Sequence, residues 1–150
     1  MTNSIPNIKV KVTWDKKVKI SEVVQITSSQ SAVDILRTIF SKDTFGWTEE
    51  MILLCMNRAN KPIAYYKISS GGISGTICDP KVVFTLALGT TSSGIIIAHN
   101  HPSGNLNPSS ADNDITQKIK KGGQLLDIKL LDHIILTEDG YYSYADNDNL

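Results

Sequence analysis

The sequence feature that most limits the fold is a short apolar run, Ile95-Ile96-Ile97-Ala98, which begins just after Gly94. A continuous apolar run of this length, without alternation of apolar and polar residues, is typical of a strand that is buried on both faces. Such a strand lies inside a sheet and needs a covering layer on each side. The run therefore predicts the central strand of a sheet with helices packed on it.

The remaining patterns supply those helices and further strands. Serines, or an aspartate followed by a proline, stand where three helices are expected to begin, because such residues suit the first turn. Two apolar segments separated by a turn predict an antiparallel hairpin, and a second pair of strands follows the last helix. This order predicts an α/β (α+β) fold with a mixed sheet. The expected helices begin near Ser28, Asp79 and Ser109 or Ser110 and end near Phe40, Leu88 and Leu125, and the expected strands are Met51–Met56, Pro62–Ser69, Lys129–Thr137 and Tyr141–Ala145.

The first part of the chain has a different pattern. Apolar and polar residues alternate from Ile8 to Trp14, as in a half-exposed strand, and Lys16–Val24 is a candidate second strand. We therefore expect residues 1–29 to form a strand-like arm and residues 30–150 to form the main domain. Edge strands such as Ile8–Trp14 also offer a route to a homo-oligomer.

Composition limits the classes of function. The 150 residues include 15 Lys+Arg and 15 Asp+Glu, so the formal net charge is +0. A neutral chain is not expected to bind nucleic acid through its overall field, nor to act as an acidic tail. Cys55 and Cys78 make neither a disulfide framework nor a metal-binding pair, and no signal peptide or membrane-length apolar run occurs. These observations predict a cytoplasmic protein without membrane contact.

Residues that carry chemistry are concentrated after the central strand. His99 and His101 stand at positions i and i+2, so their side chains point to one side of an extended chain. Asp112 falls in the first turn of the next expected helix, where a carboxylate suits the helix dipole. Two imidazoles and one carboxylate predict a zinc site with an open position for water, whose pKa zinc lowers to about 7. The spacing alone also fits a polar loop followed by an ordinary helix start.

A family resemblance extends this prediction. Residues 98–112 are AHNHPSGNLNPSSAD, in which His-x-His is followed by seven residues and then Ser-x-x-Asp. This spacing resembles the JAMM motif of MPN-domain metallopeptidases. With Leu131-Asp132-His133 and a closing Gly140-Tyr141-Tyr142-Ser143, the chain resembles the RadC family, long labelled as DNA repair proteins, over about residues 30 to 146.

The resemblance implies a fold, a reaction and a set of site residues. The fold is MPN/JAB-like, and the reaction is hydrolysis of an amide or isopeptide bond in a peptide or protein. One Zn²⁺ per chain is expected, held by His99, His101 and Asp112, and the Ser109 hydroxyl is expected to support the oxyanion. The family label adds DNA as a further partner, but residues 1–29 do not resemble the helix-hairpin-helix region that many RadC chains carry.

The sequence differs from the JAMM motif at the position of the catalytic glutamate. That glutamate lies on an upstream strand and moves the proton from water to the leaving amine. An alignment on Gly71 puts Lys67 at its position, and no acid occurs between Glu50 and Asp79. A lysine that is protonated at pH 7 cannot act as a general base. Three alternatives remain: a catalytically inactive MPN-type interaction module, an acid supplied by Glu49, Glu50 or Asp79, or an engineered lysine at position 67.

His133 is the third histidine of the chain and lies in an apolar segment. A histidine in such a segment is expected to be buried and to donate a hydrogen bond to a neighbour. We favour this role over that of a fourth metal ligand.

Overall fold

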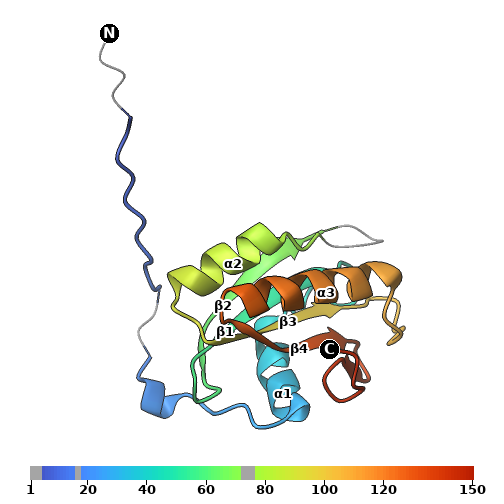
Figure 1. The fold of residues 1–150 in the computed structure, drawn as a ribbon. Coiled ribbons are helices and arrows are strands. Elements are labelled where there is room, and N and C mark those ends of the chain that lie inside the picture. The colour runs from blue at the N-terminus through green and yellow to red at the C-terminus, as the bar shows by residue number, and fades with distance from the viewer. Residues whose placement is uncertain (1–4, 16–17, 72–76) are drawn as a thin grey trace.

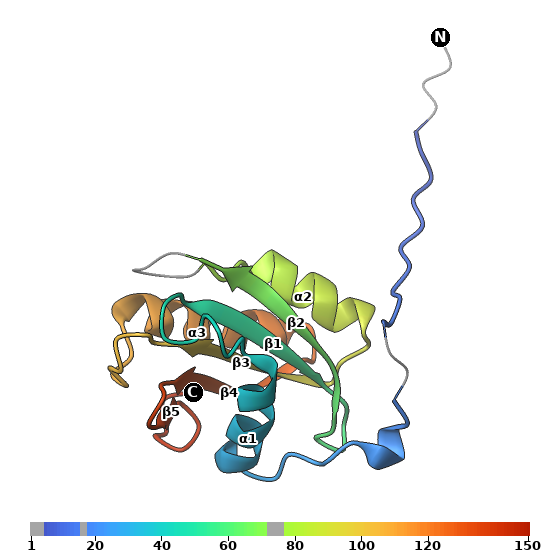
Figure 2. The same cartoon turned by 180° about the vertical axis from the view of Figure 1, so that it is seen from behind.

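The protein has a five-stranded mixed sheet with helices on both faces, within the residues described by the computed structural model, 5–15, 18–71 and 77–150. The strand order is β2-β1-β3-β4-β5, and only the β3–β4 pair is parallel. Figures 1 and 2 show α1 on one face and α2 and α3 on the other. The predicted α/β fold is confirmed, and none of the described helices is long and apolar enough to cross a membrane. The elements are η1 (Ile20–Glu22), α1 (Ser29–Ile39), β1 (Glu50–Met56), β2 (Pro62–Ser70), α2 (Pro80–Gly89), β3 (Gly94–Asn100), α3 (Ser110–Leu125), β4 (Lys129–Leu136) and β5 (Tyr141–Ser143).

The three α-helices begin where their capping residues predict. The Ser28 hydroxyl accepts a hydrogen bond from the Ser31 N–H at the start of α1, and Asp79 accepts one from the Lys81 N–H at the start of α2. Ser109 caps α3 in a reciprocal arrangement with Asp112, three residues later. Each cap satisfies backbone N–H groups that have no partner inside the helix. The start of α3, which carries a predicted metal ligand, is therefore fixed locally.

Side chains of the central strands alternate between two cores. Even-numbered residues of β1 and β3, such as Ile52 and Ile96, pack with Leu36 of α1. Odd-numbered residues, such as Leu53 and Ile97, pack with residues of α2 and α3. All residues of β3 are buried, and burial of each isoleucine contributes about 1.5–3 kcal/mol. This burial holds the end of β3 firmly. Because side chains alternate along the strand, the side chain of residue 99 points toward α3 and that of residue 100 points toward α1.

The predicted strand at Ile8–Trp14 is wrong. Residues 5–15 have no strand and no helix, and the side chains of Ile8 and Val10 are largely exposed. Figures 1 and 2 show this segment running away from the sheet. In the candidate second strand, residues 16 and 17 lie outside the described residues, and the described part contains the turn η1 instead. Alternation of apolar and polar residues gives an extended segment one apolar face and one polar face. A β-strand also needs a neighbouring strand whose backbone pairs with its N–H and C=O groups.

Replacement of Gly123 by alanine is expected to destabilise the protein. A Cβ at Gly123 of α3 would lie 2.1 Å from the Ile128 carbonyl oxygen, a backbone atom that cannot swing away. The gain in helix propensity is about 1 kcal/mol, whereas overpacking costs about 1–3 kcal/mol and more for a backbone clash. We expect Gly123→Ala to lower the free energy of unfolding by about 2 kcal/mol in urea titrations. The neighbouring exposed Gln124→Ala should change it by less than about 0.5 kcal/mol, and equal effects of the two changes would contradict the clash.

Candidate metal centre

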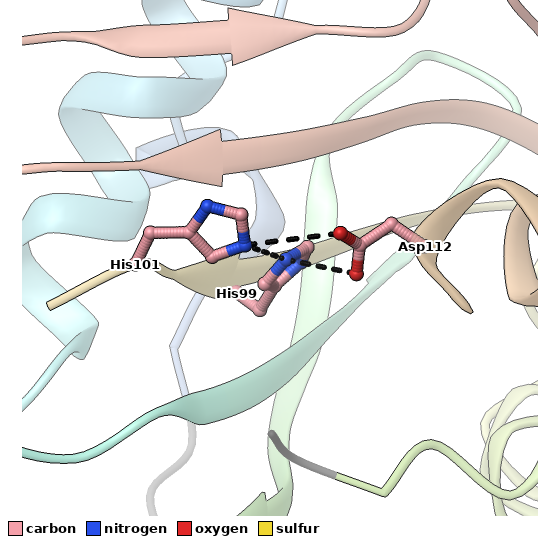
Figure 3. Close-up of side chains that lie close together, drawn as sticks. All are labelled: His99, His101 and Asp112. Carbon is pink, nitrogen blue, oxygen red and sulfur yellow. Dashed lines mark hydrogen bonds and ion pairs between the residues drawn. The ribbon is translucent and has the colours of Figure 1, made fainter. Parts of the chain in front are cut away.

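Three predicted ligands meet at the end of β3. The ligand atoms of His99, His101 and Asp112 lie within 4.8 Å of one another, and no other such group of histidine, cysteine or acidic side chains occurs among the described residues. His99 Nε2 is 2.9 Å from His101 Nε2 and 3.2 Å from Asp112 Oδ1, and His101 Nε2 is 3.8 Å from Asp112 Oδ2. Figure 3 shows both rings and the carboxylate directed toward one point.

Strand, loop and helix position these ligands. His99 continues the odd-numbered series of β3 and is almost fully buried. The His101 N–H donates to the Leu136 carbonyl at 2.8 Å, so the backbone remains attached to β4 just beyond the strand. The chain then turns back through Gly104, whose φ of +78° lies in the left-handed region. It enters α3, where Asp112 occupies the first turn and faces the strand end.

The Asn105 carbonyl identifies which ring nitrogen of His101 carries a hydrogen. His101 Nδ1 lies 2.6 Å from the Asn105 carbonyl oxygen. A carbonyl oxygen only accepts hydrogen bonds, so Nδ1 must carry the hydrogen. In the neutral ring, Nε2 then presents a lone pair toward His99 and Asp112. Histidine ligands of metals commonly donate their other N–H in this way.

Asp112 is a carboxylate in this arrangement. Burial alone would raise its pKa, but the neighbouring His99 and the hydrogen bonds from Ser109 outweigh burial and hold the pKa well below its usual range. Its Oδ2 accepts hydrogen bonds from the Ser109 N–H at 2.7 Å and from the Ser109 hydroxyl at 2.6 Å. Its Oδ1 is the oxygen nearest to His99. The carboxylate is therefore charged and fixed in direction.

The donor set fits a divalent metal such as zinc. The His101 lone pair and a carboxylate oxygen converge with His99 Nε2, and a group of acceptors at this separation repels itself unless a cation or a proton lies between them. Two imidazoles and one carboxylate are a common protein ligand set for catalytic zinc, and they leave a coordination position open. The geometry thus supplies an observation beyond spacing that favours a metal.

Ser109 lies beside Asp112, and its hydroxyl is engaged in the cap of α3. The Oγ donates to Asp112 Oδ2 and accepts from the Asp112 N–H at 3.1 Å. Asp79, one of the acids considered as a replacement base, serves as the cap of α2. Ser109 is therefore close enough to the ligands to act there, and its present bonds orient Asp112.

Lys67 does not join the cluster. In the β1–β2 ladder it lies opposite Ile52, whose side chain belongs to the core on the α1 face. Its ammonium is 2.8 Å from Oε1 of the buried Glu50, which also accepts from the Thr44 hydroxyl at 3.1 Å. The ligand His99 belongs to the series that faces α3. The geometry therefore does not support an alignment that gives Lys67 the glutamate's position, and it places Glu50 away from the ligands as well.

Glu49 lies on the same face of the sheet as His99. The Gly71 N–H donates to the Glu49 carbonyl at 3.1 Å, which continues the β1–β2 ladder one residue beyond Glu50. Glu49 thus shares its side of the strand with Met51, whose ladder partner on β3 is His99. Glu49 is only partly buried, and its carboxylate makes no hydrogen bond or ion pair with the rest of the described chain. Glu49 is therefore an acid without a described side-chain partner, and it lies two residues before Met51, the ladder partner of His99.

Asn100, between the two histidines, was missed by sequence reasoning. Its fully buried side chain accepts from the Glu50 N–H at 2.7 Å and donates to the carbonyls of Phe45 and Thr48 at 2.6 and 2.9 Å. The peptide groups on both sides of Glu49 are therefore bound to one side chain. The only available signal was its place in the motif, where the i+1 residue must point to the opposite face of the strand.

His133 is buried and contacts a ligand directly. His133 Nε2 lies 2.9 Å from His99 Nδ1, and the ring stacks on Tyr144 with a centroid distance of 4.8 Å. Burial, followed by the neighbouring His99, holds the pKa of His133 well below its usual value, so the ring is neutral. The prediction of a buried histidine bonded to a neighbour is confirmed. His133 is not part of the group of converging ligand atoms.

The two cysteines take no part in the centre. Cys55 is buried in β1. Burial, with a smaller contribution from Asp79, raises the pKa of Cys78 to about 11. A thiol with this pKa is protonated at neutral pH and is a poor nucleophile. Neither thiol belongs to the group formed by His99, His101 and Asp112.

Comparison with known proteins agrees with the fold and the motif. The family model of the RadC-like JAB domain matches residues 26–149. Because the match covers most of the chain, the protein belongs to the RadC-like JAB domain family. The predicted MPN/JAB relationship is thereby confirmed.

The similar proteins carry uninformative names. A UPF0758 protein of Flavobacterium johnsoniae is 47% identical over 127 residues, which are 85% of this chain and 54% of that protein. A UPF0758 protein of Porphyromonas gingivalis is 42% identical over 99 residues, 65% of this chain and 44% of that protein. The UPF0758 protein YfjY of Escherichia coli is 39% identical over 124 residues, 83% of this chain and 76% of that protein. The chain thus spans about half the length of the first two relatives.

Proposed function

We propose that this domain is a zinc-dependent hydrolase that cleaves an amide or isopeptide bond in a peptide or protein. The observation that carries the proposal is the convergence of His99, His101 and Asp112 with acceptor atoms facing one another. The membership in the RadC-like JAB family supports the same chemistry. A zinc ion held by these residues would supply a Lewis acid that polarises the substrate carbonyl and lowers the pKa of water.

In this proposal the chain's own residues handle the proton and the developing charge. A Glu49 carboxylate oxygen accepts a proton from the attacking water and later gives it to the nitrogen of the leaving amine. Its position on the ligand face and its lack of a described partner suit this transfer. The Ser109 hydroxyl, whose single hydrogen is donated to Asp112 Oδ2 in the free chain, turns to donate to the oxygen of the former carbonyl as negative charge develops there.

Glu49 also weighs against the alternative of an inactive interaction module. That alternative depended on the absence of an acid at the site, because Lys67 took the glutamate's place in the alignment. Lys67 instead belongs to an ion pair on the α1 face. In this proposal Glu49 supplies the acid that the alignment on Gly71 left missing. A role on DNA has only the family label in its favour, and the formal net charge of +0 gives it no support.

A substrate screen tests the proposal. The zinc-loaded chain is incubated with two libraries of fluorogenic substrates, one with peptide bonds and one with amides on a lysine side chain. We expect cleavage of at least one amide class, loss of cleavage after chelation and recovery after zinc is restored. Failure of the zinc-loaded chain to cleave either library, with zinc content verified, would contradict the proposal.

A further inference from the structure

A chain of hydrogen bonds joins two of the three ligands through the interior of the protein. His99 Nδ1 lies 2.9 Å from His133 Nε2, and His133 Nδ1 lies 2.6 Å from the Thr116 hydroxyl. The Thr116 hydroxyl lies in turn 2.6 Å from the backbone carbonyl of Asp112. His99, Thr116 and His133 are all almost completely buried. The chain therefore starts at one ligand and ends at the backbone of another.

The donor and acceptor of each hydrogen bond in this chain follow from its last group, the Asp112 carbonyl. The Asp112 carbonyl oxygen can only accept, so the single hydroxyl hydrogen of Thr116 points to it. Toward His133, the Thr116 oxygen is then an acceptor, and His133 Nδ1 must carry a hydrogen. The His133 ring is fully buried, and its hydrogen-bond partners are His99 and Thr116 and not a carboxylate, which favours the neutral ring. In the neutral ring Nε2 has a lone pair and accepts from His99. His99 consequently carries a hydrogen on Nδ1, and in the neutral form of the ring its Nε2 presents a lone pair toward His101 and Asp112.

We infer that Thr116 and His133 are positioning residues that select the His99 tautomer able to bind a metal. The inference rests on the proposed function for the identity of the metal as zinc, whereas the tautomer is a property of the metal-free chain. His101 obtains the same tautomer in a simpler way, from the Asn105 carbonyl. The Nδ1 of His99 has no such carbonyl partner. It hydrogen-bonds to the ring of His133, so the orientation of His133 must itself be fixed.

The surroundings of His133 suit this task. Its ring lies nearly parallel to Tyr144, with an interplanar angle of 6°, and the Tyr144 hydroxyl donates to Asn113 Oδ1 at 2.8 Å. The imidazole, which projects from strand β4, is thus held by Tyr144 on one side and by its hydrogen bond to Thr116 of helix α3. Because the ring is buried, water does not compete for either ring nitrogen. Without the Thr116 hydroxyl, the opposite direction becomes available, in which His99 Nε2 carries the hydrogen and donates it to Asp112.

The test uses the metal-free protein and a matched pair of variants. Thr116→Val keeps the size of the side chain and removes the hydroxyl, whereas Thr116→Ser keeps the hydroxyl. Imidazole ¹⁵N spectra identify which ring nitrogen of His99 is protonated, and competition with a chromophoric chelator gives the affinity for zinc. In the wild type and Thr116→Ser we expect the hydrogen on Nδ1. In Thr116→Val we expect a shift toward Nε2 and a zinc affinity weaker by about 10–100-fold.

Two results would overturn the inference. One is a wild-type, metal-free His99 with its hydrogen on Nε2. The other is a Thr116→Val variant that retains both the Nδ1 tautomer and the zinc affinity of Thr116→Ser. The spectra need neither zinc nor a substrate, so they decide the inference even in a chain that cleaves no amide. Failure of the proposed function is therefore visible separately, as absence of turnover by the zinc-loaded chain.

Discussion

Glu49→Gln is expected to lower kcat on a cleaved amide by about 10²–10⁴-fold, the usual contribution of a general base. The amide of glutamine is close in size to the carboxyl group but cannot accept the proton from water. Zinc content should stay unchanged, since Glu49 is not among the converging ligand atoms. The measurements are kcat and KM on the best substrate from the screen, together with elemental analysis of the purified variant.

Lys67→Arg is the matched control for this prediction. Arginine retains the charge that pairs with Glu50, so the buried carboxylate keeps a partner. It cannot lose its proton at any working pH and so cannot replace a lysine that acts as a base. We expect near wild-type turnover. Loss of turnover in Lys67→Arg together with normal turnover in Glu49→Gln would reverse the assignment of the base.

His101→Ala is expected to reduce bound zinc from about one ion per chain to nearly none. The change removes one of three protein ligands, and the two that remain, His99 and Asp112, make a weak site. A metal that binds only the folded state stabilises it by about 2.7 kcal/mol at a free concentration of 100 times Kd. Zinc should therefore raise the melting temperature of the wild type and leave that of His101→Ala almost unchanged.

Gln117→Ala serves as the control for the loss of zinc, because Gln117 is exposed on the same helix as Asp112 and touches none of the ligands. It should bind zinc as the wild type does. The protein should be purified without chelator, and zinc should be determined by elemental analysis. Full zinc occupancy in His101→Ala would show that the metal sits elsewhere.

Much of the fold could be predicted because its signals are local. The caps at Ser28, Asp79 and Ser109 act within one helical turn, and all three helices begin where these residues predict. The buried strand β3 is marked by its own composition. The prediction of a strand in the N-terminal arm was wrong because a strand depends on contacts that are not local. The alternation in Ile8–Trp14 is also local, but a strand exists only with a partner, and the sequence does not specify one.

The sequence offered Glu49 only as one of three candidate acids, because the choice among them depends on the register of β1 and β2. The β1–β2 ladder is irregular between Met51 and Ile52, which pair with Ser69 and Lys67. One extra residue on β2 changes which of its side chains face α3, since alternation reverses at a bulge. Counting back from Gly71 across such a point assigns residues to the wrong face. The ligands escaped this problem because His99, His101 and Asp112 follow one another along a single strand, loop and helix.

The three hydrogen bonds of the Asn100 side chain determine whether the backbone around Glu49 is ordered before a substrate binds. A carboxylate on a loose segment would have to be fixed anew each time a substrate arrived, and fixing one backbone residue costs about 1–2 kcal/mol. Here the peptide groups that flank Glu49 are already bound to the residue between the two histidines. Folding itself therefore holds the backbone on both sides of Glu49 against the segment that carries His99 and His101. In the proposed function, this backbone is ordered before any substrate binds.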